Sequence, residues 1–506
     1  MSCIFNTNDT FSLSAIRVRA LFVWLGVLMC VSVAQNTFAA TFTVTRSDDR
    51  NAVCNSGVDC SLREAVNAAN VGFINDTINF AAGLSVITLA AEIEIIPAGS
   101  LTVSGAGANV VTIDGGAGTN RLFYLSNANV VISGVTMQGG NGVGTPPVGT
   151  TPGVGDVLFG GAIFSVGGNL VLNSVVLQDN GGTFLIGGGV SMFGGTHRII
   201  NSTFSRNTSN QCGGFYFSGA AFSMVNSTIS GNTSATTPNG TGGGGGFCSN
   251  GPATVRNSTV TDNSSTGVGS GAGGVFITNG VTLDIGNTII AGNSGLQFPD
   301  IRNIGTIISA GNNLIGDSAG DSANTSTPIT YQPSDILDTP PQLGALTIFN
   351  GGATPTHALL SGSPAIDKGG NALAVDPSNN SALTTDQRGS SRVFDGDGNN
   401  VATVDIGAFE RQVFAPTAAE VTIGGRVTTA NGRGIRSARI TLMNADGETR
   451  IALSGAFGYF RFANVPAGET YLFTVFAKRY QFDAPTRLLS VNGETDDLIF
   501  VALEDK

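Results

Sequence analysis

The sequence has few charged residues, histidines and tryptophans. Only 12% of its 506 residues are charged, and it contains two histidines and one tryptophan. So few charges are unlike a chain of long exposed helices, and two histidines make a Cys/His metal site improbable. The formal charge of −11 argues against a partner that needs a basic surface, such as nucleic acid or an anionic membrane.

Glycine is abundant instead, with 72 residues, and hydrophobic residues make up 41% of the chain. Glycine and asparagine in such numbers suit many turns between short strands. A chain of this length can bury a large core and is expected to form more than one domain. Composition therefore predicts a β-rich protein with several domains.

Residues 1–40 have the organisation of a secretory signal peptide. Arginines precede an apolar run over residues 20–34, and small residues follow at Ala39 and Ala40. An apolar run of about 15 residues is too short to span a bilayer, which takes about 20. We therefore expect cleavage after Ala39 or Ala40, a secreted or outer-surface location, and no transmembrane span.

The segment SLREAVNAAN, which begins at Ser61, predicts a short amphipathic helix. Ser61 and Glu64 have the spacing of a capping box, in which each side chain accepts a hydrogen bond from a free backbone N–H. The apolar residues that follow share one helical face. A single helix before a long β-rich region suggests a lid over an exposed sheet end. For Arg63 and Glu64 we favour surface and capping roles over catalysis.

One seven-residue phrase returns four times in the middle of the chain. NSTFSRN, NSTISGN, NSTVTDN and NTIIAGN begin at Asn201, Asn226, Asn257 and Asn287. The second asparagine of the phrase recurs every 25 to 31 residues, at Asn207, Asn232, Asn263 and Asn293. A period of this length implies a solenoid or a propeller.

Apolar residues hold fixed places in this repeat. Three residues before the second asparagine stand Leu177, Phe204, Ile229, Val260 and Ile290; eight before it stand Leu172, Ile199, Met224, Val255 and Ile285. Each repeat has room for short strands but not for a helix. It therefore predicts a parallel β-helix, in which successive coils lie about 4.8 Å apart and the apolar columns stack inside.

The two asparagines are expected to mark two corners of each coil. Asparagine side chains that are stacked at the strand spacing can bond to one another in a row. We therefore expect structural asparagine ladders inside the solenoid, formed by Asn201, Asn226, Asn257 and Asn287 and by Asn207, Asn232, Asn263 and Asn293.

Four cysteines remain after the expected signal peptide. Cys54 and Cys60 lie six residues apart, and an oxidising compartment favours a local disulfide between them. Cys212 and Cys248 lie on neighbouring repeats at different places in the repeat. For this second pair, the sequence does not decide between a disulfide and two free thiols.

Two stretches resemble known families of exported proteins. CSLREAVNAAN resembles the motif of CSLREA-domain proteins, exported bacterial proteins in which it precedes a right-handed parallel β-helix. SPAIDKG, TTDQRGSSR and DIGAFE, between Ser363 and Glu410, resemble the choice-of-anchor region that accompanies β-helices of surface proteins. The resemblance implies a right-handed parallel β-helix, here of about ten coils. It brings no agreed catalytic residues.

The chain changes character after Pro416. Short runs alternate apolar and polar residues, separated by turns such as Asn431-Gly432, as in a small β-sandwich. GRVTTANGRGIRSARITL and GYFRFANVPAGETY resemble carboxypeptidase regulatory-like (transthyretin-like) domains. That resemblance implies a spacer or recognition module without peptidase chemistry.

These observations predict an all-β chain with five parts. After the signal peptide (1–40) we expect an N-terminal cap (41–78), the parallel β-helix (79–320), a region that closes its open end (321–415) and an Ig-like or transthyretin-like β-sandwich (416–506).

The acidic segment FDGDGNNVATVD invites a calcium hypothesis. It brings together Asp395, Asp397, Asn399 and Asp405. The spacing departs from an EF-hand loop, which needs glycine at its sixth position and glutamate at its twelfth. Solvated turn acids are the default interpretation, Ca²⁺ is the alternative, and no other cofactor is expected.

Charged residues of the coils are scattered along the chain. The position before the second asparagine holds Asp179, Arg206, Gly231, Asp262 and Gly292, and further arginines stand at 198, 256 and 302. Glycoside hydrolysis needs converging carboxylates, and lyase chemistry a base beside acidic groups. No catalytic residue is assigned. We expect a monomeric, non-catalytic adhesion protein that contacts carbohydrate or a surface protein; a polysaccharide lyase or glycoside hydrolase is the alternative.

Overall fold

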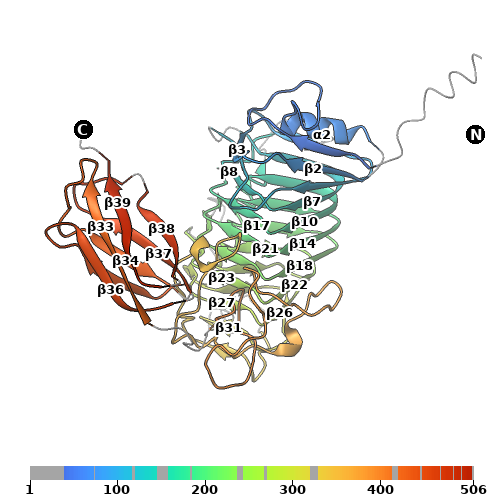
Figure 1. Cartoon of the computed structure of the whole chain (residues 1–506). Coiled ribbons are helices and arrows are strands. Elements are labelled where there is room, and N and C mark those ends of the chain that lie inside the picture. Colours follow the sequence, from blue (N-terminus) through green and yellow to red (C-terminus); the bar gives the residue numbers. More distant parts are fainter. Residues whose placement is uncertain are drawn as a thin grey trace, which may run out of the picture.

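The computed structural model describes residues 39–72, 75–116, 120–144, 158–182, 185–235, 243–266, 271–318, 329–412, 420–444, 447–467, 469–482, 484–491 and 493–503. The expected signal peptide thus lies almost entirely outside the described residues. Figure 1 shows a solenoid of stacked strands with a separate β-sandwich beside it. Among the described residues, no helix combines the length and the apolar character needed to cross a membrane.

A helix and two strands begin the solenoid: β1 (Thr41–Val44), α2 (Leu62–Asn70) and β2 (Asp76–Phe80). Ser61 and Glu64 form the capping box, since the Ser61 hydroxyl accepts from the Glu64 N–H and the Glu64 carboxylate from the Ser61 N–H. The apolar face of α2 is buried, and the helix lies at one end of the stack in Figure 1. Cys54 and Cys60 form the expected disulfide just before it.

Parallel pairing between successive coils builds the solenoid. One sheet has ten strands: β3 (Val86–Thr88), β6 (Thr112–Asp114), β8 (Thr136–Gln138), β11 (Val176–Gln178), β15 (Thr203–Ser205), β19 (Thr228–Ser230), β23 (Thr259–Thr261), β27 (Ile289–Ile290), β31 (Leu314–Ile315) and β32 (Ile336–Leu337). One strand per coil agrees with the predicted ten coils.

A second sheet has sixteen strands, because each coil supplies two segments to it. Besides β1 and β2, these are β4 (Ile93–Ile95), β5 (Ser100–Ser104), β7 (Phe123–Ser133), β10 (Ile163–Asn173), β13 (Val190–Phe193), β14 (Thr196–Ile200), β17 (Phe215–Ser218), β18 (Ala221–Val225), β21 (Phe247–Ser249), β22 (Ala253–Arg256), β25 (Val275–Ile277), β26 (Thr282–Gly286), β29 (Ile301–Asn303) and β30 (Thr306–Ser309).

Two small sheets complete the coils. One has four strands, β16 (Thr208–Ser209), β20 (Thr233–Ser234), β24 (Ser264–Ser265) and β28 (Ser294–Gly295), and the other pairs β9 (Leu158–Phe159) with β12 (Leu185–Ile186). Neighbouring coils are also joined by a disulfide between Cys212 and Cys248, which settles the pairing that the sequence left open.

The apolar columns stack as the repeat predicts. Leu177, Phe204, Ile229, Val260 and Ile290 are register partners in successive strands, and each is at most 1% exposed. The column of Leu172 behaves in the same way in the larger sheet. Equivalent residues of successive coils therefore lie on top of one another and form a continuous core.

Each coil turns at two corners where the backbone is left-handed. The first corner holds Asn201, Asn226, Asn257 and Asn287, all with φ between 47° and 50°. The second holds the residue before the second asparagine, such as Arg206 (φ 54°) or Gly231 (φ 69°). Asparagine and glycine adopt this conformation more readily than other residues, which explains why they recur there.

The second asparagine column forms a buried ladder. The amide nitrogens of Asn180, Asn207, Asn232 and Asn263 each donate to the amide oxygen of the asparagine one coil further on, over 2.9–3.0 Å. Each of these oxygens also accepts the backbone N–H of the preceding asparagine. The row ends at Asp300, whose carboxylate accepts two hydrogen bonds from Asn293.

The first asparagine column does not form such a ladder, and that expectation is wrong. Its side chains turn outward and donate to backbone carbonyls far along the chain: Asn226 to Thr385, Asn257 to Leu373 and Asn287 to Gly370. A single bond within the column joins Asn287 to Asn257. The left-handed turn at this corner points the amide away from the bore, which the identity of the residue alone does not reveal.

The receiving segment, residues 338–411, is called the strap below. It includes the short helices η2 (Ile348–Asn350) and η3 (Asn371–Leu373). The outer threonines of three successive strands bond to it: Thr203 donates to the Pro355 carbonyl and Thr228 to the Gln387 amide, while Thr259 accepts from the Ala408 N–H. The strap thus lies along a lateral face of the ten-stranded sheet instead of only closing the open end, as the sequence predicted.

An apolar cluster fixes the strap to the solenoid. It joins solenoid residues to strap residues and contains Ile289, Ala291, Leu314, Ala358, Leu359, Ala365, Ile366, Ile406 and Phe409. Arg392, fully buried, donates to the Asn257 side chain at 3.0 Å and to the Gly407 carbonyl at 2.6 Å. A second apolar core therefore lies between the strap and the outer face of the ten-stranded sheet.

The C-terminal domain is a two-layered β-sandwich. Its sheets are β36-β33-β39 and β35-β34-β37-β38, formed by β33 (Glu420–Thr429), β34 (Arg439–Met443), β35 (Thr449–Leu453), β36 (Tyr459–Pro466), β37 (Glu469–Phe476), β38 (Thr486–Val491) and β39 (Thr495–Ala502). Pairing is antiparallel except between β33 and β39. Its apolar core, which includes Ile423 and Phe473, contains residues of this domain alone.

Candidate functional site

The scattered charges of the coils are held in contacts between neighbouring segments. The ion pairs are Asp179 with Arg206 (2.6 Å), Asp284 with Arg256 (2.7 Å) and Asp376 of the strap with Arg198 (2.5 Å). Arg302 lies over the ring of Phe276, 4.8 Å from its centre. These arginines therefore join coils to one another or to the strap, a role the sequence did not reveal.

A serine and a histidine meet under the strap. The hydroxyl of Ser230 lies 2.8 Å from Nε2 of His357, and Nδ1 of His357 lies 2.7 Å from the Gly344 carbonyl. This geometry is shared by nucleophile and base pairs. Both residues are at most 4% exposed, however, and burial lowers the pKa of His357. The pair bridges the strap and the solenoid out of reach of a substrate.

Two fully buried acids of the strap, Asp405 and Glu410, have strongly raised pKa values. Burial raises the pKa of Glu410 to about 9 and that of Asp405 to about 7, although Arg392 opposes both shifts. Shifts of this size often mark catalytic sites. Here all three side chains have 0% exposure, and Glu410 and Asp405 accept backbone hydrogen bonds within the strap. They hold the strap in shape.

The acids proposed as calcium ligands separate into two places. Asp395 and Asp397 lie together, and a third carboxylate, from Asp367, joins them within 4.8 Å. Asp405 instead accepts the N–H groups of Asp367 and Arg411, and the side-chain oxygen of Asn399 accepts the N–H of Val401. Asp405 therefore lies outside the cluster, and the sequence missed Asp367; Asn399, whose side-chain amide donates to Asp397 at 3.0 Å, stays a predicted ligand.

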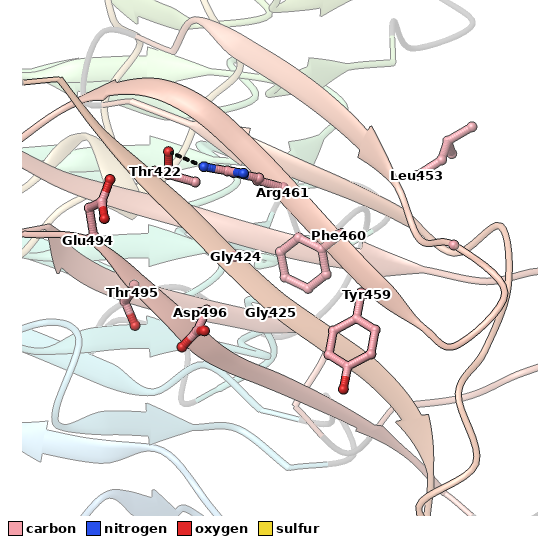
Figure 2. Close-up of a pocket in the computed structure, with 11 residues that line it drawn as sticks. Thr422, Gly424, Gly425, Leu453, Tyr459, Phe460, Arg461, Glu494, Thr495 and Asp496 are labelled. Carbon is pink, nitrogen blue, oxygen red and sulfur yellow. Dashed lines mark hydrogen bonds between the residues drawn. The ribbon is translucent and has the colours of Figure 1, made fainter.

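A cleft of about 810 Å³ opens on the sandwich. Its lining comes from β33, β36, the end of β35 with Gly455 after it, and the start of β39 with Glu494 before it: Thr422, Gly424, Gly425, Leu453, Gly455, Tyr459, Phe460, Arg461, Glu494, Thr495 and Asp496. Figure 2 shows the glycine pair at its centre, with Glu494 and Asp496 on one side and the ring of Tyr459 on the other.

The glycine pair in β33 creates the space. A Cβ on Gly425 would lie 2.0 Å from the Leu498 carbonyl oxygen and 2.7 Å from the Phe460 ring, so a larger residue does not fit. A Cβ on Gly424 would meet Asp496 at 3.4 Å, an ordinary contact. Glycine inside a strand often marks a place where a ligand or another backbone comes close.

The polar groups of the cleft carry both signs of charge. Arg461 donates to the Thr422 hydroxyl at 3.0 Å, as the dashed line in Figure 2 shows. Tyr459 is 60% exposed, and the guanidinium of Arg426 lies 5.1 Å from its ring centre. An exposed ring beside an arginine and two carboxylates can stack on a ligand and bond to its hydroxyl groups.

Exposed aromatic side chains concentrate on this domain. Among the described residues, the large aromatic side chains that are mostly exposed are Phe457, Tyr459 and Phe476, and all three belong to the sandwich. The solenoid aromatics Phe215 and Phe217 are fully buried. Among the described residues, the rings that are mostly exposed to a partner thus lie on the sandwich.

Comparison with known families identifies this domain. Residues 422–503 match the carboxypeptidase regulatory-like domain. The match covers the whole cleft and agrees with the resemblance seen in the sequence. No curated protein matches the chain.

Sequence reasoning named none of the cleft residues. The signals that could have found them are the glycine pair within a strand and the two acids Glu494 and Asp496 at the start of the last strand. Each is common in β-sandwiches, and only the pairing of β33 with β36 and β39 brings Arg461 and Asp496 to the same face.

Proposed function

We propose that this protein is an exported, non-catalytic surface protein whose C-terminal sandwich binds carbohydrate. The observation that carries the proposal is the cleft on the sandwich, with Tyr459 exposed beside Arg461 and two carboxylates. A flat ring and groups that donate and accept hydrogen bonds suit a ligand with many hydroxyl groups.

Export is supported by three features. The sequence begins with a stretch typical of a signal peptide, and it resembles exported CSLREA and choice-of-anchor β-helix proteins. The two disulfides suit an oxidising compartment. In this proposal the solenoid is a stiff stalk that carries the sandwich. The chain is expected to be a monomer, and light scattering measures its mass.

Binding to immobilised glycans tests the function. We expect the chain from residue 41 onward to bind a subset of them, and Tyr459→Ala or Arg461→Ala to weaken that binding at least tenfold, about 1.4 kcal/mol each. Phe476→Ala is the matched control, because this ring is equally exposed but lies on the other sheet. Unchanged binding in the Tyr459 and Arg461 variants, or binding to surface proteins alone, would contradict the proposal.

The alternative is a polysaccharide lyase or glycoside hydrolase. Incubation with uronic-acid polymers and neutral glycans, followed by analysis of chain length, separates the two functions. Our proposal expects polymers of unchanged length. Shortened polymers, produced by a purified chain and lost on mutation of an arginine or acid of the solenoid, would establish the alternative.

A further inference from the structure

Three carboxylates converge in the strap. One oxygen from each of Asp367, Asp395 and Asp397 lies within 4.8 Å of the other two. Asp367 belongs to an earlier pass of the strap than the loop of Asp395 and Asp397. The Gly396 N–H, which donates to Oδ1 of Asp367 at 3.1 Å, brings the loop onto it.

Asp367 has a buried oxygen without a hydrogen-bond donor. The residue is 7% exposed, and its Oδ2 has no donor among the described residues. Burial raises the pKa of Asp367, and the charges of Asp397 and Asp395 act in the same direction. A buried carboxylate oxygen normally has a partner, because its removal from water is costly. A positive ligand at this oxygen would supply such a partner.

Within the described residues none of the three carboxylates forms an ion pair. Arg411, which contacts the same loop, donates to the Gly396 carbonyl at 2.8 Å. The loop also positions its ligands, since Asp395 accepts the backbone N–H groups of Gly398, Asn399 and Asn400. Its carboxylate is oriented before any ion arrives.

We propose that Asp367, Asp395 and Asp397 bind a divalent cation, Ca²⁺. Carboxylate oxygens are the ligands that Ca²⁺ prefers, at about 2.3–2.6 Å, so one ion can bridge oxygens as far apart as 4.8 Å. Mg²⁺ needs about 2.0–2.1 Å to each ligand and near-octahedral geometry, a stricter requirement than that of Ca²⁺. The site is independent of the proposed carbohydrate site.

Bound Ca²⁺ would tie two passes of the strap together close to one of its contacts with the solenoid. Asp367 lies three residues before Gly370, whose N–H donates to Asn287 and whose carbonyl accepts from it. The ion would join the loop of Asp395 to the segment that leads to this corner. Calcium is therefore expected to stabilise the docked strap.

Calorimetric titration of the chelator-treated full chain tests the site. We expect one Ca²⁺ site and, at about 5 mM Ca²⁺, an unfolding midpoint raised by roughly 2 °C or more. Asp367→Asn and Asp397→Asn should each weaken binding at least about tenfold. Asp397 is exposed, so its variant is expected to fold even if the Asp367 variant does not.

One variant serves as the control. Asp179→Asn, on the solenoid surface, should bind Ca²⁺ within about threefold of the unmodified chain. The proposal fails if titration detects no saturable binding up to about 5 mM. It also fails if Asp397→Asn binds as tightly as the unmodified chain, or if Mg²⁺ binds more tightly than Ca²⁺.

Discussion

At the residue scale, the side chain of each ladder asparagine hydrogen-bonds to backbone groups that the turn at the corner would otherwise leave unpaired. Asn207 accepts the backbone N–H and the side-chain amide of Asn180, and donates to the Leu177 carbonyl and to Asn232. Asn201, six residues earlier, is placed by its backbone, with φ at 50°. The same residue type therefore does two different jobs within one phrase.

Substitutions within that phrase separate the two roles. We expect Asn207→Ala to lower the free energy of unfolding by about 3 kcal/mol, since it leaves several buried donors and acceptors unpaired. Asn201→Gly should change it by less than about 1 kcal/mol, because glycine adopts a positive φ without steric cost. Denaturant unfolding measures both, and equal losses would contradict the assigned roles.

The acid at the end of the ladder adds a pH dependence. Burial raises the pKa of Asp300 to about 6, against an ordinary value of 3.8, although the donors of Asn293 oppose the shift. The folded chain therefore binds this proton more tightly than the unfolded chain. The contribution of Asp300 to the free energy of unfolding is fully present below pH 3.8. It is lost as the pH rises through about 6, and the loss amounts to at most about 3 kcal/mol.

Denaturant unfolding at several pH values from 4 to 7 tests this. The free energy of unfolding of the unmodified chain should fall with rising pH more steeply than that of Asp300→Asn, which has no proton to lose. The difference between the two curves isolates Asp300 from other carboxyl groups. Parallel curves would show that Asp300 does not titrate in this range.

At the element scale, the strap depends on a few buried polar anchors. Gln387 donates to the hydroxyl groups of Thr203 and Thr354 and accepts from that of Thr228. We expect Gln387→Leu to leave these groups unpaired and to lower stability by roughly 2–4 kcal/mol. Limited proteolysis should then cut the strap before the solenoid. Gln412→Leu is the control, since the bond of Gln412 to the Ser391 carbonyl is exposed.

The coils could be predicted from the sequence because every coil needs apolar residues at the same positions. Leu177, Phe204 and their equivalents must be apolar in each coil, so their period is visible in one sequence. The strap has no such period, and its contacts follow from the outer threonines of the ten-stranded sheet. The sequence also pairs Asp395 with the nearby Asp405, whereas the fold brings it to Asp367, which is more distant in the chain.

At the scale of the whole molecule, the sandwich and the solenoid have separate apolar cores. We expect a chain that ends at residue 412 to keep its thermal unfolding midpoint within about 2 °C, and the full chain to unfold in two calorimetric transitions. The isolated residues 420–506 should account for one of them. A single transition, or a large loss of solenoid stability on truncation, would show that the two parts depend on each other.

The asparagine ladder has a direction. Every amide from Asn180 to Asn263 passes its hydrogen towards the later coil, and Asp300 at the end can only receive. Extra coils inserted among the asparagines would preserve this relay. An ionised carboxylate has no hydrogen to pass on, so this row of amides ends at Asp300, while the solenoid itself continues through β30, β31 and β32.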